Sequence, residues 1–257
     1  MSNAIVVVPA GIELPAHLQT EEVAAAIAAA NAAAAGGIKS GGFPRISIKA
    51  GKFHIVRGAE VQTLLAPPAA VGQPALPMMC LEVVIVAANP ALTKTYFPGK
   101  WVEGSNDEPA CRSANGVTPD ADAPQKQSTV CATCPQNAWG SKVSEISGKD
   151  VKACTDSKQL AVLPAADLSF EALGLAIQPG SLKNWGNYIR ALDERKFPVF
   201  GLVTNVTFDA TATGVLQFGF NRFLTPVEAA KVAERANGSD VKLIVAQSRV
   251  ISTGAPA

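Results

Sequence analysis

The sequence predicts a mainly β protein with a few helices, built as an antiparallel barrel of the OB type that carries a long polar loop. Three observations predict this class. Short β-like runs bounded by turn residues outnumber the helical segments. The apolar run 78–88 has the length and composition of a buried strand. The polar stretch 105–158 interrupts the strands and holds four of the five cysteines. A β-sandwich with added helices satisfies the same pattern, so that alternative stays open.

The composition is that of an ordinary globular protein, and it excludes few functions. The chain has 257 residues, 48% of them hydrophobic and 17% charged, with a formal net charge of +1. So small a net charge means that any nucleic-acid site must be argued from where the charge lies. No apolar stretch reaches the roughly 18 residues of a membrane span, and the first residues lack a signal-peptide pattern. We therefore expect a cytoplasmic protein with no membrane partner.

Three regions follow from the pattern along the chain. Residues 1–37 form an N-terminal extension with an alanine-rich helix, which Thr20 caps and the glycine pair after residue 35 ends. Residues 38–245 form the OB-like domain, including the polar loop 105–158. Residues 246–257 form a flexible C-terminal tail.

The first strands of the domain carry its basic charge. Residues 38–58 include five lysines and arginines and no acid. Residues 45–49 alternate basic or polar residues with isoleucine, which predicts a strand with one wet and one buried face. Ala50-Gly51 is a turn, and residues 52–57 form the returning strand. A basic, aromatic hairpin face suits a nucleic-acid backbone with stacked bases, and an ordinary solvated strand face is the alternative.

The later elements follow from apolar spacing and turn residues. Ser181 is the expected N-cap of a helix with an apolar stripe that contains Trp185, and Thr225-Pro226 is a second helix start. The expected elements are a central strand at 78–88, strands at 159–163 and 172–177, a helix at 181–196, a hairpin of 197–209 and 215–222, and a helix at 225–237.

The cysteine spacing predicts one structural zinc ion. Equal spacers of 19 residues separate Cys111 and Cys154 from the central Cys131-Ala-Thr-Cys134 motif. Two thiolates three positions apart can face one tetrahedral Zn²⁺, and the flanking cysteines would close a four-cysteine site with no open position. Disulfides and free thiols are the alternatives, and an odd cysteine count disfavours a disulfide framework. Cys80, beside the apolar run, is expected to be a buried core thiol.

The residues around these cysteines resemble a family. The stretches 109–120, 127–141, 148–149 and 153–156, with 48–53 upstream, are similar to a group of tailed-phage proteins that bind single-stranded DNA. The resemblance is dense over about 105–165 and thinner over 40–60. It implies a host-cell cytoplasmic protein that acts in phage DNA replication or recombination, meets replication or recombination proteins and self-associates along DNA.

Binding of single-stranded DNA needs cations for phosphates and rings for bases. A second cluster of these residue types, 94–101, comes just before the cysteine loop. Packing of its rings against the central strand is the alternative interpretation. The predicted DNA-binding residues are Lys49, Lys52, Phe53, Arg57, Lys94, Tyr96, Phe97, Lys100, Trp101, Arg112 and Trp139.

Catalysis is not expected. A zinc deaminase needs an H-x-E motif, and neither His17 nor His54 is followed by that glutamate. Walker A, G-x-S-x-G and H-E-x-x-H motifs are also missing from the sequence. The alternative function is a zinc-stabilised structural or scaffold protein that does not bind nucleic acid.

Overall fold

The computed structural model describes residues 43–58, 60–68, 70, 73–99, 108–144, 148–210, 212 and 214–246, together with positions 15, 17, 20, 23, 26, 27 and 30. The chain forms two compact units, Met1–Gly41 and Gly42–Ala257. In the first, the N–H of Val23 lies 3.4 Å from Thr20 Oγ1, the contact expected of a capping threonine. Most of the expected helix after it, and the tail beyond Ala246, lie outside the described residues.

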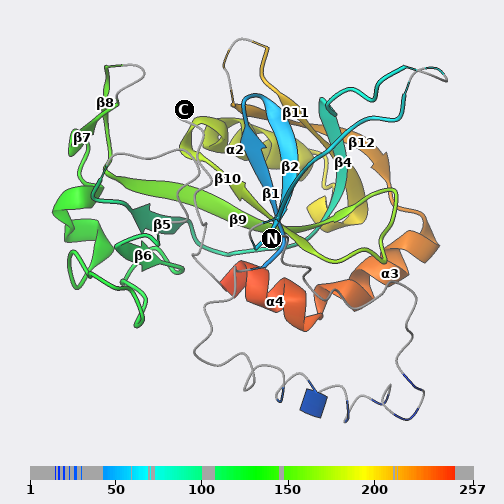
Figure 1. Ribbon diagram of the computed structural model, residues 1–257, viewed down its shortest axis with the longest axis horizontal. Coiled ribbons are helices and arrows are strands. Elements are labelled where there is room, and N and C mark those ends of the chain that lie inside the picture. The colour runs from blue at the N-terminus through cyan, green and yellow to red at the C-terminus, as the bar shows by residue number, and fades with distance from the viewer. Residues whose placement is uncertain are drawn as a thin grey trace, which may run out of the picture. The chain divides into compact units, whose positions relative to one another are not determined.

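One mixed sheet of ten strands forms the body of the described part of the second unit (Figure 1). Its main path runs β12 (Leu216–Phe223), β11 (Leu202–Phe208), β4 (Cys80–Ala88), β9 (Cys154–Pro164), β10 (Leu173–Ile177), β1 (Arg45–Lys49), β2 (Lys52–Arg57) and β3 (Glu60–Thr63). β5 (Thr93–Tyr96) joins β9, and β6 (Cys111–Ser113) joins β5. A separate two-stranded ribbon pairs β7 (Lys142–Val143) with β8 (Asp150–Val151).

The sheet curls strongly into a half-barrel, which confirms the mainly β class. Phe53 of β2 stacks on Phe208 of β11 with ring centroids 4.3 Å apart, although four strands separate β2 from β11 in the sheet. The face that these rings share is therefore the concave one. The β1–β10 pair is parallel and the other neighbours along the main path are antiparallel, so the sheet is not the fully antiparallel one predicted. A parallel pair needs a long connection, and here most of the domain lies between the two strands.

Two apolar cores cover the two faces of the central strands. In β4, Leu81, Val83 and Ile85 join the concave core, while Val84 and Val86 join a second core on the convex face. β9 divides its residues in the same way. The uninterrupted apolar run predicted as a central strand is thus explained, because both of its faces are buried. Cys80 lies at the start of β4 and is only half-buried, so it is not the core thiol expected.

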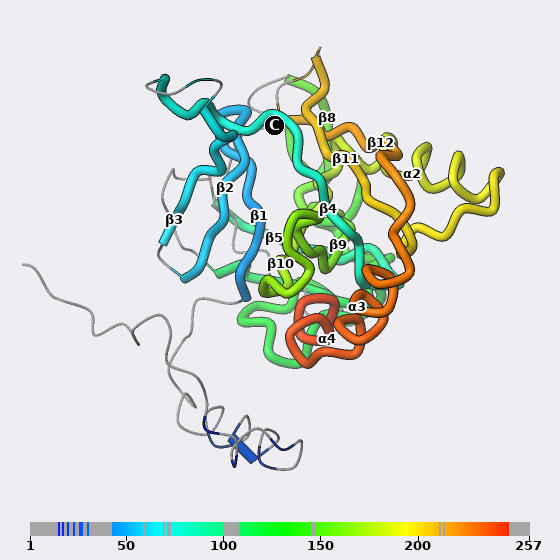
Figure 2. The backbone as a smooth tube through the Cα atoms, turned by 90° about the vertical axis from the view of Figure 1, so that its right-hand side faces the viewer, coloured from blue at the N-terminus to red at the C-terminus, as the bar shows by residue number. Residues whose placement is uncertain are grey.

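The helices complete the two cores from opposite sides (Figure 2). α2 (Pro179–Glu194) closes the concave core with Trp185, Tyr188 and Leu192, as the predicted apolar stripe requires. Its N-cap is Gln178, and Ser181 lies inside the helix, where its Oγ accepts a hydrogen bond of 2.8 Å from the Leu216 N–H. α3 (Pro226–Ala236) and α4 (Ser239–Ala246) lie together over the convex core.

Short 3₁₀ turns complete the described elements: Cys131–Thr133, Pro135–Asn137 and Val199–Gly201. The last of these replaces the start of the strand predicted from residue 197. None of the helices in the described part of the chain has the length and hydropathy needed to cross a membrane.

The start of α3 should make stability depend on pH. Thr225 and Glu228 form a capping box, and Arg222 donates to the Glu228 carboxylate over 2.8 Å. These bonds, the Arg222 bond first, lower the pKa of Glu228 from 4.5 to about 2. Because the folded pKa is the lower one, the stabilisation is complete above pH 4.5 and is lost as the pH falls towards 2.

We therefore expect Glu228→Gln to be less stable than the wild type above about pH 5 and to approach it near pH 2. Urea unfolding at a series of pH values measures the difference. Glu234→Gln, an exposed change on the same helix, is the control. A Glu228→Gln deficit that stays constant down to pH 2 would contradict the linkage.

Candidate functional site

Strand register brings two of the four predicted cysteine ligands into one row. Tyr96 of β5 lies opposite Cys111 of β6 on one side and opposite Cys154 of β9 on the other. Neighbouring strands are about 4.8 Å apart, so the two cysteines flank the tyrosine at the same level of the sheet. This row lies in the lobe that β5, β6, β7 and β8 form at one end of β9 (Figure 1).

The C-x-x-C motif folds over that row. Residues Cys131–Thr133 form a 3₁₀ turn, and the Cys134 N–H donates back to the Cys131 carbonyl over 3.3 Å. The Cys131 N–H bonds the Val117 carbonyl at 2.8 Å, which attaches the turn to the preceding loop. The next turn begins at Pro135, whose fixed φ suits that position.

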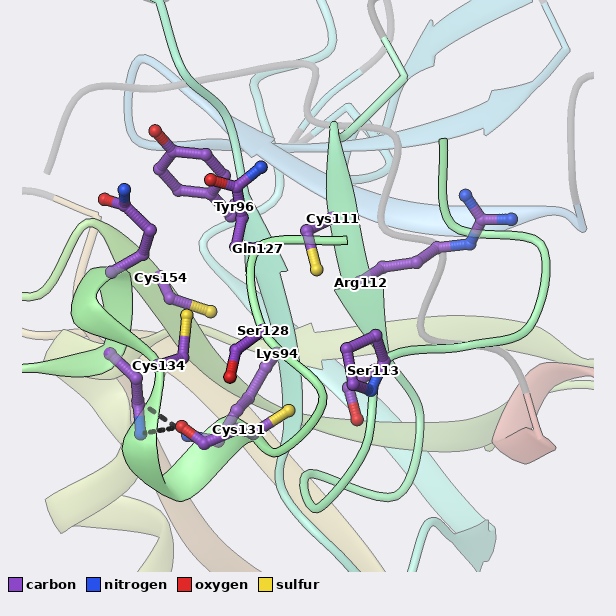
Figure 3. A pocket seen from close by; sticks show the side chains of 13 residues that line it. Lys94, Tyr96, Cys111, Arg112, Ser113, Gln127, Ser128, Cys131, Cys134 and Cys154 are labelled. Atoms are coloured by element: carbon purple, nitrogen blue, oxygen red, sulfur yellow. Dashed lines mark hydrogen bonds between the residues drawn. The ribbon is translucent and has the colours of Figure 1, made fainter. Parts of the chain in front are cut away.

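All four cysteines line one small cavity (Figure 3). They are free thiols, each less than a tenth exposed. The cavity holds about 10 Å³, roughly the room for one water-sized sphere. Among the described residues, however, no three His, Cys, Asp or Glu side chains are arranged so that they could hold a metal ion. The thiols share the cavity without forming a closed coordination shell.

The donor set and the size of the cavity nevertheless fit a single soft ion. Four sulfur ligands suit Zn²⁺, and the space excludes an organic cofactor. Burial raises the pKa of the Cys154 thiol to about 12, while the nearby Lys94 ammonium acts in the opposite direction.

The sequence predicts that Arg112 binds DNA. In the structure its side chain has a structural role. It is 6% exposed, and its guanidinium contacts three carboxylates, those of Glu108, Asp120 and Asp122. Burial requires the charge of Arg112 to be matched by acids of its own loop, and a phosphate would have to displace them. The DNA contact of Arg112 stays a prediction.

The loop after β6 is ordered by its own polar side chains. Asn115 Oδ1 accepts hydrogen bonds from the N–H groups of Val117 and Thr118, and Asp120 Oδ1 accepts one from Ala114. Asx-type bonds supply part of that order.

Lys94 is also inside the cysteine lobe. Its ammonium pairs with Asp156 and donates to Asn137 Oδ1 at 3.0 Å, and its side chain is 12% exposed. Tyr96 lines the cavity and Phe97 is half-buried. Lys100 and Trp101 lie outside the described residues. The predicted cluster at 94–101 thus contributes at least Lys94 and Tyr96 to the cysteine site.

The β1–β2 hairpin separates its predicted residues between two faces. Phe53 is fully buried on the concave face, and Arg57, also on that face, pairs with Glu171 and lies over the Phe170 ring. Phe53 is therefore enclosed in the core, where a base does not reach it in this structure, while the DNA contact of Arg57, whose side chain is 30% exposed, stays a prediction. Lys49 and Lys52 lie on the convex face instead.

The convex face of the first three strands is basic. Lys49 stands directly opposite Lys52, and Ser47 opposite His54. Alternation along the strands also puts Arg45 on this face, at 7% exposure. Glu60 is the one acidic residue of β1, β2 and β3, and it lies opposite Arg57 on the concave face. The residues that these three strands present on the convex face therefore include no acid. The same period of two adds His54 to this face, whereas Arg45 is buried and does not offer its charge to a ligand.

Among the predicted aromatic residues that the structure describes, Trp139 is the most exposed. Its side chain is 75% exposed, on the turn that leads from the C-x-x-C motif into β7. Lys142 and Lys149 are exposed on the β7–β8 ribbon that follows. An exposed indole three residues before an exposed lysine has the composition of a stacking site for bases, although the exposed Asp150 lies near Gly140 of the same turn.

Comparisons with protein-family models, with curated proteins and with solved structures each found no match.

Proposed function

We propose that this protein binds single-stranded DNA without catalysis and acts in phage DNA replication or recombination. The observation that supports this best is the acid-free basic face of β1–β3. Like charges directly opposite each other on neighbouring strands are destabilising, and Lys49 and Lys52 occupy such a pair. A phosphate bound between them would contact both ammonium groups. The hairpin turn at Ala50-Gly51 has positive φ at both residues. Ala50, which is not a glycine, is therefore held in an energetically costly backbone conformation beside the lysine pair.

The exposed Trp139 would supply the second element of such a site. Stacking on a base is worth about 1–3 kcal/mol and tolerates any sequence, because every base has a flat face. Cations together with a ring therefore favour single strands over duplex, in which bases are already stacked. We further propose that the curled half-barrel is an enlarged OB-type barrel, whose concave core α2 closes.

We also propose that Cys111, Cys131, Cys134 and Cys154 bind one structural zinc ion. The support is the shared cavity, its size and its four sulfur donors. Binding would require the thiols to lose their protons and to close around the ion from their present positions. When bound, the ion supplies cross-links between three segments of the lobe rather than a reactive position.

Binding by the convex face is tested with a double substitution. We expect Lys49→Ala with Lys52→Ala to weaken binding of a fluorescent oligo-dT. The slope of log affinity against log salt should also fall by about 1 per lysine. Fluorescence anisotropy at several salt concentrations measures both. The melting temperature, measured on the same preparations, shows whether the loss of affinity is separate from a loss of stability.

Lys183→Ala with Lys231→Ala, exposed lysines on α2 and α3, is the matched control. Equal loss in both double variants would show that only overall charge matters. Duplex DNA that competes as well as a single strand of equal length would sink the proposed selectivity. Wild-type protein with no salt-dependent binding would leave the alternative of a structural or scaffold protein.

A further inference from the structure

The polar residues around the cysteine cavity form a connected group that joins the cysteine-bearing segments. Lys94 of β5 pairs with Asp156, which follows Cys154 by two positions on β9. It also donates to Asn137 Oδ1 at 3.0 Å. Two of the three donors of this ammonium are thus engaged within the described part of the chain.

Asn137 carries the connection to the C-x-x-C motif. Its side-chain N–H donates to the Cys131 carbonyl at 2.9 Å, and its backbone N–H donates to the Cys134 carbonyl at 2.9 Å. Lys94 itself lies two residues before Tyr96, the residue paired with both Cys111 and Cys154. One lysine side chain and its strand therefore connect every segment that supplies a thiol.

The charges around the cavity are unevenly balanced. Among the residues that the structure describes, Lys94 and Lys152 on one side share one carboxylate, that of Asp156. On the other side Arg112 meets three carboxylates. A divalent ion with four thiolates would carry a net charge of about −2, and a buried charge needs compensation close by. Lys94 lines the cavity and lies on the side with excess positive charge.

We propose that Lys94, held by Asn137 and Asp156, is a positioning residue of the metal site. It sets the C-x-x-C turn against the β5–β6–β9 row and offsets the charge of the bound thiolates. The inference rests on the proposed zinc site. It removes Lys94 from the DNA-binding residues and gives it an outer-shell role, of the kind whose loss weakens metal binding about 10–100-fold.

The test is competition for Zn²⁺ against a chromogenic chelator, with wild type, Lys94→Met, Asn137→Ala and Lys142→Met. Lys94→Met should lower zinc affinity about 10–100-fold. Asn137→Ala should also lower the zinc affinity, because this change frees the C-x-x-C turn while Lys94 is still present. Lys142→Met, an exposed lysine of the same lobe, should leave affinity within twofold. Co²⁺ spectra report whether four thiolates still bind in each variant.

A purely structural role is distinguished by melting the metal-free proteins. Lys152 still pairs with Asp156 in Lys94→Met, so the metal-free melting temperature should change little. Zinc affinity within twofold of wild type in both Lys94→Met and Asn137→Ala overturns the inference while the zinc site stands. A wild-type protein that takes up no Zn²⁺ overturns the zinc site and this role together. If Lys94→Met does not fold, the Asn137→Ala result decides.

Discussion

Freshly purified Cys131→Ser protein is expected to contain no zinc, whereas the wild type is expected to contain one zinc ion per chain. Cys131 belongs to the motif that supplies two of the four thiols, and a serine hydroxyl is a poor replacement for a thiolate. Metal binding and ordering of the ligand segments are a single process, worth about 10–16 kcal/mol in small zinc peptides. Elemental analysis gives the zinc content directly.

The loss should be confined to the lobe. None of the four cysteines belongs to either apolar core, so the half-barrel should stay folded in Cys131→Ser. Limited proteolysis should then cut between about residues 104 and 158 while the remaining sheet resists. Asx-type bonds at Asn115 and Asp120 persist without metal, so cutting is expected nearer the C-x-x-C turn than the loop after β6.

Cys80→Ser is the control for this prediction. Cys80 begins β4, is half-buried, and is not among the residues that line the cysteine cavity. Its replacement should leave one zinc per chain and an unchanged protease pattern. Wild-type protein with well under one zinc per chain would refute the metal centre. The zinc content of the wild type is decisive because the thiols in this structure are not closed around an ion.

Much of the sheet could be predicted because its signals are local. Alternation in β1 and the continuous apolar run in β4 each follow from which faces are buried. The same reasoning, carried further, places Phe53 correctly. A two-residue turn fixes Ile48 opposite Phe53, so the ring shares the face of the isoleucines. The error lay in treating the hairpin as one surface rather than two.

Other parts of the site had no local signal. Arg112 meets acids at irregular spacings in a loop, and only the folded loop brings them together. The role of Lys94 depends on the pairing of β5 with β9, across a separation of about sixty residues. α4 was missed because Asn237-Gly238 resembles a helix end. The chain does end α3 there, but it begins a new helix at Ser239.

The two faces of the hairpin lead to opposite expectations for aromatic substitutions. Phe53→Ala should lower the free energy of unfolding by about 3–5 kcal/mol, because the ring is fully buried and stacked on Phe208. DNA affinity per folded molecule should not change, since the convex face keeps its lysines. Trp139→Ala should do the reverse. It should cost about 1–3 kcal/mol of binding and little stability, because its indole is 75% exposed.

Urea unfolding and oligo-dT anisotropy, made on the same preparations, separate the two effects. Trp185→Ala gives a second core reference, since this indole packs on Tyr188 and Phe218 and should lose stability without a specific loss of binding. A Phe53→Ala protein that is as stable as the wild type but binds weakly would show that the ring leaves the core to meet DNA. A Trp139→Ala protein that binds as strongly as the wild type would instead remove stacking from the proposal. The Lys49–Lys52 pair would then account for the affinity through phosphate contacts alone, which implies a steeper dependence of affinity on salt.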